Sequence, residues 1–302
     1  MISVIITTCK RETVIIERAI RSVLAQTYPH WELLVVDDNE AECAYHAANE
    51  KMVQKYAAAF PVYYVDLHGN YGACKARNAG IAKAKGEYIA FLDDDDEFLP
   101  EKLEKQVRFL QQHPQVAFVS CGAYMVDEKT GNKTPLYLPA IKHDAYEELL
   151  HAGSNFLGGC SFPLIRTSLL REIGGFDEEL QSCQDYDVWL RIAQKYPLAV
   201  LPELLLNYYV CTVGQISRNY RKKIQGHWRL YQKNQAYLQQ HPAACREHLY
   251  SLAYYQAWNG DWRDALQNWG KSVYLAPFAV CRNLRNLAAL AKRYFLFRRE
   301  SK

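Results

Sequence analysis

The first hundred residues alternate short apolar runs with amphipathic segments, and this alternation limits the fold more than any other feature. The β-branched run at residues 3–8 predicts a strand that is buried on both faces. The other expected strands are 33–36, 62–65 and 88–92, and the expected helices between them are 14–24, 42–59 and 73–85. Right-handed crossovers between such strands give a parallel sheet covered by helices. The sequence therefore predicts an α/β fold with a mostly parallel, Rossmann-like sheet flanked by helices.

Composition suits two globular parts. The chain has 302 residues, 49% of them hydrophobic and 23% charged, enough for one large domain and a smaller one. From about residue 212 the sequence has helical character and is rich in Tyr, Trp and Gln. Residues 260–277 within that region resemble the second helix of a tetratricopeptide repeat. We expect a large domain at 1–211, with halves 1–100 and 101–211, and a C-terminal helical domain at 212–302.

The cysteines and the N-terminus indicate the cellular compartment. The nine cysteines lie more than twenty residues apart and form no Cys-x-x-Cys pair, which is typical of reduced thiols in a cytosolic protein. The N-terminus lacks the pattern of a signal peptide, and the most apolar later stretch, residues 198–210, is too short to cross a bilayer. We therefore expect a cytoplasmic protein without a transmembrane helix.

Basic charge is concentrated at the C-terminal end. The chain carries a net charge of +3, but residues 281–302 alone carry +6, which leaves −3 for the rest. We therefore expect no nucleic-acid partner. Two interpretations of this tail remain open: a helix that lies on an anionic membrane at the inner face of the plasma membrane, or a helix that docks within the protein. Its expected apolar stripe is formed by Leu284, Leu287, Ala288, Ala291 and Phe295.

Five consecutive acidic residues, Asp93 to Glu97, follow the predicted strand at 88–92. Carboxylates about 4 Å apart repel by about 4 kcal/mol near a protein surface, and a cation relieves that repulsion. Carboxylate oxygens favour Mg²⁺ or Mn²⁺, which typically bind one or two carboxylates plus substrate phosphates. Ligands of parallel sheets bind at the carboxyl ends of the strands, which favours a metal site over a merely solvated acidic loop.

A second acidic pair, Asp37-Asp38, ends the strand predicted at 33–36. A carboxylate at this position can accept hydrogen bonds from a ribose or from the N–H group of a base. The alternative is that Asp38 or Asn39 caps the next helix. Both interpretations are compatible, since Asn39 can cap the helix while Asp38 binds a ligand.

Ordered motifs give the sequence a family resemblance. It resembles the inverting, nucleotide-sugar-dependent glycosyltransferases of family 2, which have the GT-A-type fold. The matching segments run in the family's order over roughly residues 1–210, and they are 3–11, 22–28, 32–38, 76–80, 86–96 and 174–178. The resemblance implies that residues 1–211 form the glycosyltransferase domain, with its donor half first and its acceptor half second.

The resemblance also implies roles for individual residues. The nucleotide-sugar would be bound by Thr8, Arg11, Asp38, Arg77, Asp93 and Asp94. Asp38 would lie towards the base and Asp93 towards the ribose. Asp93 and Asp95 form the family's Asp-x-Asp and would hold Mn²⁺ or Mg²⁺ against the diphosphate. From the residues alone, Arg77 could instead be an arginine on a helix surface.

Asp185 is the candidate general base. The family usually has Glu-Asp about ten residues after Gly-Phe-Asp, and this chain has Gln184-Asp185 at that place. A single aspartate suffices to take the proton of an acceptor hydroxyl, although Gln184 departs from the pattern. The alternative is helix capping by Asp185 or Asp187, with Asp187 the better placed of the two.

The resemblance implies transfer of one sugar, with inversion, from a UDP-sugar to a saccharide or lipid-linked saccharide in surface polysaccharide, lipopolysaccharide or glycoconjugate biosynthesis. The processive Gln-x-x-Arg-Trp signature is absent from the sequence. A nucleotidyltransferase is one alternative, but it requires a Gly-rich, Lys-containing loop after the first strand, and residues 7–11 contain no glycine. A nucleotide-binding adaptor without turnover is the other alternative, favoured only by Gln184.

Overall fold

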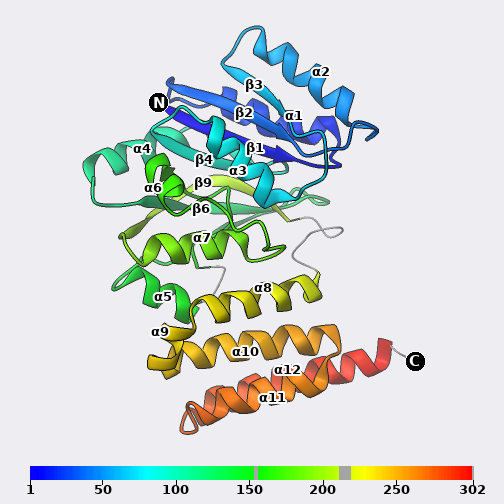
Figure 1. Cartoon of the computed structure of the whole chain (residues 1–302), viewed down its shortest axis with the longest axis vertical. Helices are drawn as coiled ribbons and strands as arrows, with labels where there is room; N and C mark the ends of the chain where they lie inside the picture. The colour runs from blue at the N-terminus through cyan, green and yellow to red at the C-terminus, as the bar shows by residue number, and fades with distance from the viewer. Residues whose placement is uncertain (153–155, 211–218, 301–302) are drawn as a thin grey trace. The chain divides into compact units, whose positions relative to one another are not determined.

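The computed structural model describes residues 1–152, 156–210 and 219–300 (Figure 1). The chain divides into two compact units. The first, which we name the sheet unit, comprises Met1–Ala145, Ser154–Glu178 and Asp185–Thr212. The second, the helical unit, comprises Tyr146–Gly153, Glu179–Gln184 and Val213–Lys302, so it includes two short segments from within the first 211 residues.

Four parallel strands form the first half of the sheet. They are β1 (Ile2–Thr8), β2 (Trp31–Asp37), β3 (Val62–Asp66) and β4 (Tyr88–Asp93), in the spatial order β3-β2-β1-β4. Thr8 pairs with Asp37, and Asp37 pairs with Asp66. On the other side of β1, Thr7 pairs with Asp93. The register therefore brings the polar residues that end these strands to one edge of the sheet.

Beyond β4 the sheet is mixed. It continues through β8 (Leu164–Arg166), β6 (Phe118–Asp127), β9 (Leu198–Val210) and the short β5 (Glu97–Phe98), while β7 (Lys133–Leu136) pairs with β6. β8 is antiparallel to β4 and β6, whereas β9 is parallel to β6. β5 follows the acidic residues directly and pairs with β9, so β9 lies beside the acidic loop.

Helices cover both faces of the parallel strands. α1 (Thr13–Leu24), α2 (His46–Ala57) and α4 (Lys102–Gln112) pack their apolar side chains on the face that carries Val4 and Ile6. α3 (Ala73–Lys83) packs on the opposite face, where a Cβ on Gly80 would lie 2.6 Å from Cγ2 of Ile5. Glycine thus permits the close approach of α3 to β1. The sheet unit also contains the shorter helices α6 (Thr167–Glu172) and, from Asp185 onward, α7 (Gln184–Ala193), whereas α5 (Ala145–Ala152) belongs to the helical unit from Tyr146 onward. The predicted α/β fold class is confirmed.

The helical unit is built from α8 (Tyr220–Lys233), α9 (Gln235–Gln240), α10 (Pro242–Asn259), α11 (Trp262–Tyr274) and α12 (Val280–Glu300). Gly260 ends α10 with a φ of 91°, a left-handed cap that reverses the chain into α11. Ala257, Ala265 and Leu290 join α10, α11 and α12 in a small apolar core. Within the described residues, no helix is both long enough and apolar enough to cross a membrane.

Two buried histidines should make the helical unit sensitive to acid. Burial lowers the pKa of His227 in α8 to about 3 and that of His248 in α10 to about 4. Unfolded histidine has a pKa near 6.5, so the unfolded chain takes up protons that the folded chain does not. The two histidines therefore do not lower the free energy of unfolding above about pH 7, but they lower it progressively as the pH drops from 6.5 towards 4. We expect a loss of about 2 kcal/mol per histidine at pH 5.

Thermal melts followed by circular dichroism at pH 7.5 and pH 5 measure this loss. His227→Phe should reduce the difference between the two pH values, whereas replacement of the exposed His30 by Gln should leave it unchanged. The same pH dependence in wild type and His227→Phe would contradict the assignment.

Candidate functional site

Thr8 and Arg11 hold two carboxylates of the acid loop, which we define as residues 93–97. The hydroxyl of Thr8, at the end of β1, donates to Oδ2 of Asp94 at 2.8 Å. Arg11 follows β1 and donates from Nε to Asp94 Oδ1 and from Nη2 to Asp95 Oδ2, both at 3.0 Å. The loop that follows β1 therefore fixes the first turn after β4.

Arg77 lies inside the site. It is buried on α3, donates from Nη2 to Oδ1 of Asp93 at 2.8 Å, and lies over the ring of Phe176. The neighbouring Asn78 accepts from the N–H of Phe176 and donates to its carbonyl oxygen. The interpretation of Arg77 as a helix-surface arginine is therefore wrong, and the segment around Phe176 braces the part of α3 that carries it.

Asp38 anchors a loop. Its carboxylate accepts from the backbone N–H of Tyr71 at 2.8 Å and from that of Gly72 at 2.7 Å, just before α3. Its own N–H donates to the carbonyl oxygen of Thr8, which keeps it beside β1. Helix α2 begins only at His46, so the capping role considered for Asp38 or Asn39 is wrong. Asn39 instead accepts from the N–H of Lys10.

Burial makes the acid loop electrostatically costly. It raises the pKa of Asp94 to about 6, and burial together with Asp93 raises the pKa of Asp95. The pKa of Asp96 lies well above its ordinary value because the carboxyl is buried beside Asp93 and Asp95. A bound cation would favour the ionised forms of these carboxylates and offset their repulsion.

The acid loop suits a divalent cation that also binds a ligand. Within residues 1–152, 156–210 and 219–300, no three or more His, Cys, Asp or Glu side chains are grouped to hold a metal by themselves. Mg²⁺ and Mn²⁺ often use only one or two carboxylates and complete their shell with phosphate and water. The side chains of Asp93 and Asp95 are 36% and 23% exposed, against 9% for Asp94. Each uses one oxygen for an arginine and keeps a second, so these two carboxylates fit such a cation.

Asp185 stands in the first turn of α7, close to the charges of this site. Its Oδ1 accepts from the N–H of Tyr186 at 2.8 Å. Burial raises its pKa; Arg77 opposes this shift and Asp93 adds to it. Gly159 lies beside this carboxylate, since a Cβ on it would be in van der Waals contact with Asp185 Oδ2, at 3.7 Å. Asp185 therefore lies within electrostatic reach of Arg77 and Asp93.

Asp187 is held differently. It is buried and pairs with Arg191 one turn later, with 2.7 Å between Oδ2 and Nη2. Arg191 also donates to the carbonyl oxygens of Ile173 and Gly175, at 2.7 Å each. The Asp187–Arg191 pair therefore links α7 to the turn at Gly174-Gly175.

Three residues that sequence reasoning missed contact the acid loop. Ser161 donates to Asp96 Oδ2 at 2.6 Å and accepts from the N–H of Asp93. Arg18 donates to the carbonyl oxygen of Asp95 and lies 3.7 Å from the ring centroid of Tyr209. The backbone N–H of Tyr209 donates to Asp96 Oδ1 at 3.0 Å. Each of these residues lies more than sixty positions along the chain from its partner in the acid loop, so no local sequence motif predicts the contact.

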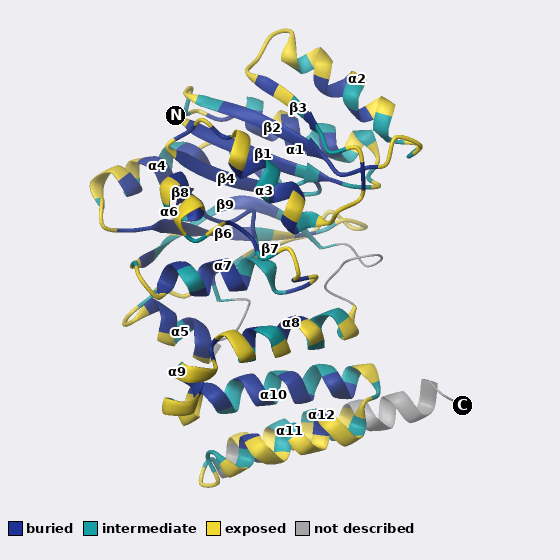
Figure 2. Cartoon of the chain, in the orientation of Figure 1, coloured by how far each residue is buried: buried dark blue, intermediate teal, exposed yellow. Residues whose placement is uncertain are grey.

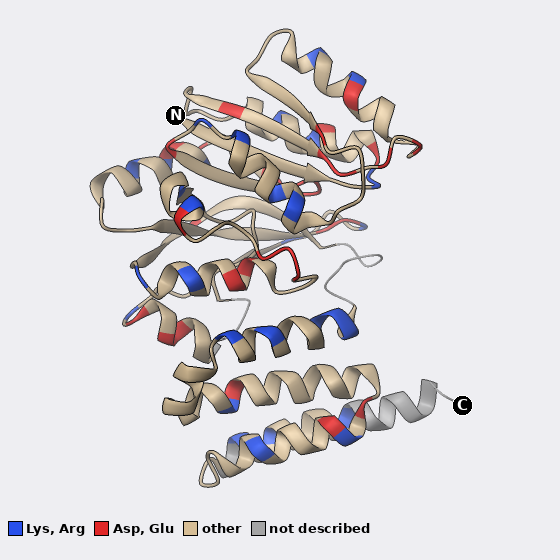
Figure 3. Ribbon diagram, viewed as in Figure 1, with Lys and Arg blue, Asp and Glu red and all other residues tan. Residues whose placement is uncertain are grey.

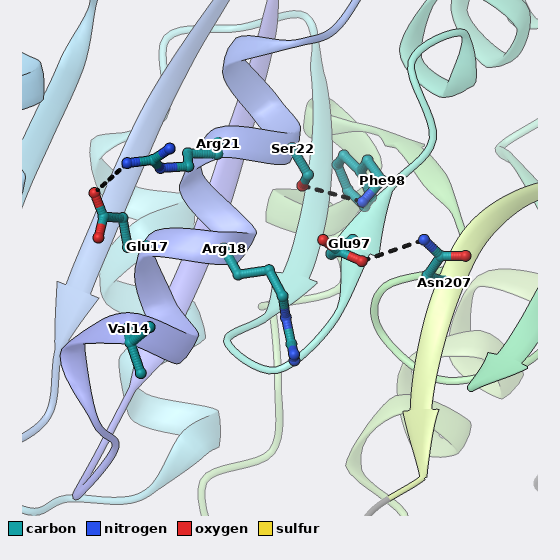
Figure 4. A pocket seen from close by; sticks show the side chains of 8 residues that line it. All are labelled: Val14, Glu17, Arg18, Arg21, Ser22, Glu97, Phe98 and Asn207. Carbon is teal, nitrogen blue, oxygen red and sulfur yellow. Dashed lines mark hydrogen bonds and ion pairs between the residues drawn. The ribbon is translucent and has the colours of Figure 1, made fainter. Parts of the chain in front are cut away.

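A surface pocket of about 530 Å³ lies beside the acid loop (Figure 4). Arg18 and Glu97 connect it to the loop, while ion-paired Glu17 and Arg21 form its opposite wall. Its lining consists of Val14, Glu17, Arg18, Arg21, Ser22, Glu97, Phe98 and Asn207. These residues differ from the predicted site residues, so we assign no substrate to this pocket.

The fold is that of the GT-A-type glycosyltransferases. It carries the acid loop at the end of β4, with arginines from two other elements and a carboxylate on α7. A sequence model of the family described as Glycosyl transferase family 2 matches residues 3–174, more than half of the chain. The chain belongs to this family, which confirms the resemblance predicted from its motifs.

Curated relatives extend the similarity. WcaA of Escherichia coli K12, whose name assigns it to colanic acid biosynthesis, is 33% identical over 65% of this chain and 67% of its own length. TuaG of Bacillus subtilis, named for teichuronic acid biosynthesis, is 30% identical over 72% of this chain and 82% of its own. An uncharacterized glycosyltransferase of Haemophilus influenzae is 32% identical, and the match covers 65% of this chain but only 63% of the relative.

Solved structures share the fold. TarS 1-349 of S. aureus, in complex with UDP-GlcNAc, aligns over 97% of this chain and 89% of its own with a TM-score of 0.64 at 18% identity. The mannosyltransferase PcManGT of Pyrobaculum calidifontis, in complex with GDP-Man and Mn²⁺, aligns over 96% of this chain and 80% of its own with a TM-score of 0.58 at 20% identity.

Proposed function

We propose that this chain transfers one sugar from a nucleotide-diphospho-sugar, a UDP-sugar by preference, to an acceptor hydroxyl with inversion. The observation that carries the proposal is the acid loop at the carboxyl end of β4, held by Arg11 and Arg77 and accompanied by Asp185. Ligands of parallel sheets bind at this edge. Support for the donor class comes from the UDP-GlcNAc and GDP-Man named in two structures of similar fold.

In this proposal the strand-end residues bind the donor. Asp38 holds the loop at Tyr71 and Gly72 beside the base, and Thr8 supports the acid loop through Asp94. Asp93 lies towards the ribose. Arg11 and Arg77 can exchange part of their carboxylate contacts for charge-assisted contacts with the diphosphate.

Asp93 and Asp95 would hold Mn²⁺ or Mg²⁺. Such an ion would neutralise the charge that develops on the departing diphosphate. Asp185 accepts the proton of the acceptor hydroxyl, whose oxygen forms the new bond to the anomeric carbon as the bond to the diphosphate breaks. A pKa raised by burial makes Asp185 a better proton acceptor than an exposed aspartate. Attack from the side opposite the leaving group inverts the anomeric centre.

The acceptor in this proposal is a saccharide or lipid-linked saccharide of a surface polysaccharide. Support comes from the relatives named for colanic and teichuronic acid biosynthesis. A chain that works on such an acceptor would act on the cytoplasmic side, where nucleotide-sugars are made.

Screening donors tests the proposal. UDP-glucose, UDP-galactose, UDP-GlcNAc and GDP-mannose are each supplied with Mn²⁺ or Mg²⁺, and release of nucleoside diphosphate is measured. We expect one UDP-sugar to be turned over, and chelation of the metal to stop the reaction. Binding of a donor without hydrolysis or transfer would favour the adaptor instead. Turnover of GDP-mannose alone would overturn the choice of nucleotide.

Asp38→Ala should weaken nucleotide binding. The change removes the carboxylate that accepts from two part-buried loop N–H groups, and hydrogen bonds to charged groups contribute about 1.5–3 kcal/mol. Calorimetry should show this loss for free UDP as well as for the nucleotide-sugar, because the loop lies on the nucleotide side. Asp38→Asn keeps one acceptor oxygen and should lose less. Equal affinities in wild type and Asp38→Ala would reduce Asp38 to a purely structural residue.

A further inference from the structure

The turn between α11 and α12 presents large apolar side chains to solvent. Phe278 in the turn is 96% exposed, and Tyr274 at the end of α11 is 85% exposed. Figure 2 shows exposed residues along this turn and on α12. On α12, Leu284 is 60% exposed, and Leu287 and Ala288 share its side of the helix. The adjacent side of α12 is buried through Asn283 and Leu290. Exposed apolar residues that gather at one turn and the helix that follows it mark interaction surfaces.

Basic residues flank this apolar surface. Arg285 and Lys292 are exposed and lie two turns apart on one side of α12, next to the apolar stripe. The turn itself is uncharged (Figure 3). From residue 265 to residue 299 the sequence contains seven Lys or Arg and no Asp or Glu. Of these cations, Arg282 pairs with Glu247 of α10 at 2.8 Å. The surface therefore combines exposed aromatic and aliphatic groups with the exposed cations Arg285 and Lys292.

We propose that this surface, which consists of Tyr274, Phe278, Leu284, Arg285, Leu287 and Lys292, docks the protein on an anionic lipid membrane. Aromatic rings favour the boundary between headgroups and acyl chains, and amphipathic helices lie there with their basic residues towards anionic headgroups. Each nearby Lys or Arg strengthens such binding through the negative surface potential.

Charge argues against a second copy of the chain as the occupant. A two-fold symmetric interface would place the same surface of both copies together. Arg285 and Lys292 of one copy would then face the same cations of the other, without acidic residues from this stretch to neutralise them. An anionic membrane can bury the apolar side chains at the edge of its acyl chains and bind the basic side chains through its headgroups.

Vesicle binding by the full chain tests the proposal without any donor, so its outcome is independent of the proposed function. We expect co-sedimentation with vesicles of phosphatidylcholine and phosphatidylglycerol, little with phosphatidylcholine alone, and a decrease as NaCl is raised. Arg285→Glu with Lys292→Glu should lower the partition coefficient roughly 25-fold or more, because each lost cation costs about fivefold. Phe278→Ser should lower it roughly tenfold.

Matched controls lie in the sheet unit. Tyr137→Ser removes another exposed aromatic ring, and Lys51→Glu reverses an exposed basic residue on α2. Both should bind vesicles as wild type does. Equal binding to neutral and anionic vesicles, or wild-type binding by the Phe278 and Arg285/Lys292 variants, would overturn the proposal. A dimer in solution that Phe278→Ser dissociates would overturn it in favour of a second copy.

Discussion

Asp95→Ala is expected to abolish metal-dependent turnover of the nucleotide-sugar while the fold stays intact. Asp95 is one of the two partly exposed carboxylates of the acid loop, and the metal it would bind contributes several kcal/mol to transition-state stabilisation. Turnover at saturating donor and Mn²⁺ should therefore fall at least roughly 10³-fold. Burial and Asp93 raise the pKa of Asp95, so its removal relieves repulsion and should not lower the melting temperature.

Turnover, calorimetry and a thermal melt together separate the metal role from a structural one. Glu128→Ala removes an exposed acid after β6 and serves as the control, with unchanged turnover expected. If Asp95→Ala binds Mn²⁺ and nucleoside diphosphate with wild-type affinity, the metal assignment is wrong.

Asp185→Asn is expected to lower the rate of sugar transfer roughly 10²- to 10⁴-fold, the usual contribution of a general base. The amide keeps the shape of the side chain and can still accept from the N–H of Tyr186, so α7 should form as before. Affinity for the donor should change little, because proton removal concerns the acceptor. The measurement is the transfer rate at saturating donor, with donor affinity from calorimetry.

Asp187→Asn is the matched control two residues away. It weakens the buried pair with Arg191 and should cost about 1–3 kcal/mol of stability while turnover of the folded enzyme persists. If Asp187→Asn is inactive and Asp185→Asn is active, the general base is Asp187 and not Asp185. If both variants remain active, the proposed transfer mechanism is wrong in kind.

Local sequence determined the parallel half of the sheet. The apolar runs predicted at 3–8, 33–36, 62–65 and 88–92 all lie within the observed strands β1 to β4. Strands buried on both faces need continuous apolar runs, which can be recognised without knowledge of their neighbours. Because every strand of a parallel array ends at the same edge, the polar residues that follow these runs could be assigned to one site.

The ends of the helices were predicted less exactly than the strands. The helix predicted at 42–59 begins at His46 and ends at Ala57, which removes the capping role considered for Asp38. The side chain of Asp38 instead accepts hydrogen bonds from the N–H groups of Tyr71 and Gly72, which lie more than thirty residues along the chain. A cap depends on neighbours in the chain, whereas this loop contact depends on the close approach of β2 and α3.

By itself, then, the sequence determined the fold class, the family and the edge of the sheet where polar residues collect, because periodicity and ordered motifs are local properties. Only the tertiary structure decided the mixed half of the sheet, the burial of Arg77 against Asp93, and the contacts of Ser161, Arg18 and Tyr209 with the acid loop. These contacts join segments far apart in the chain. They depend on which strands become neighbours, and that choice is made by the packing of the whole core rather than by any one segment.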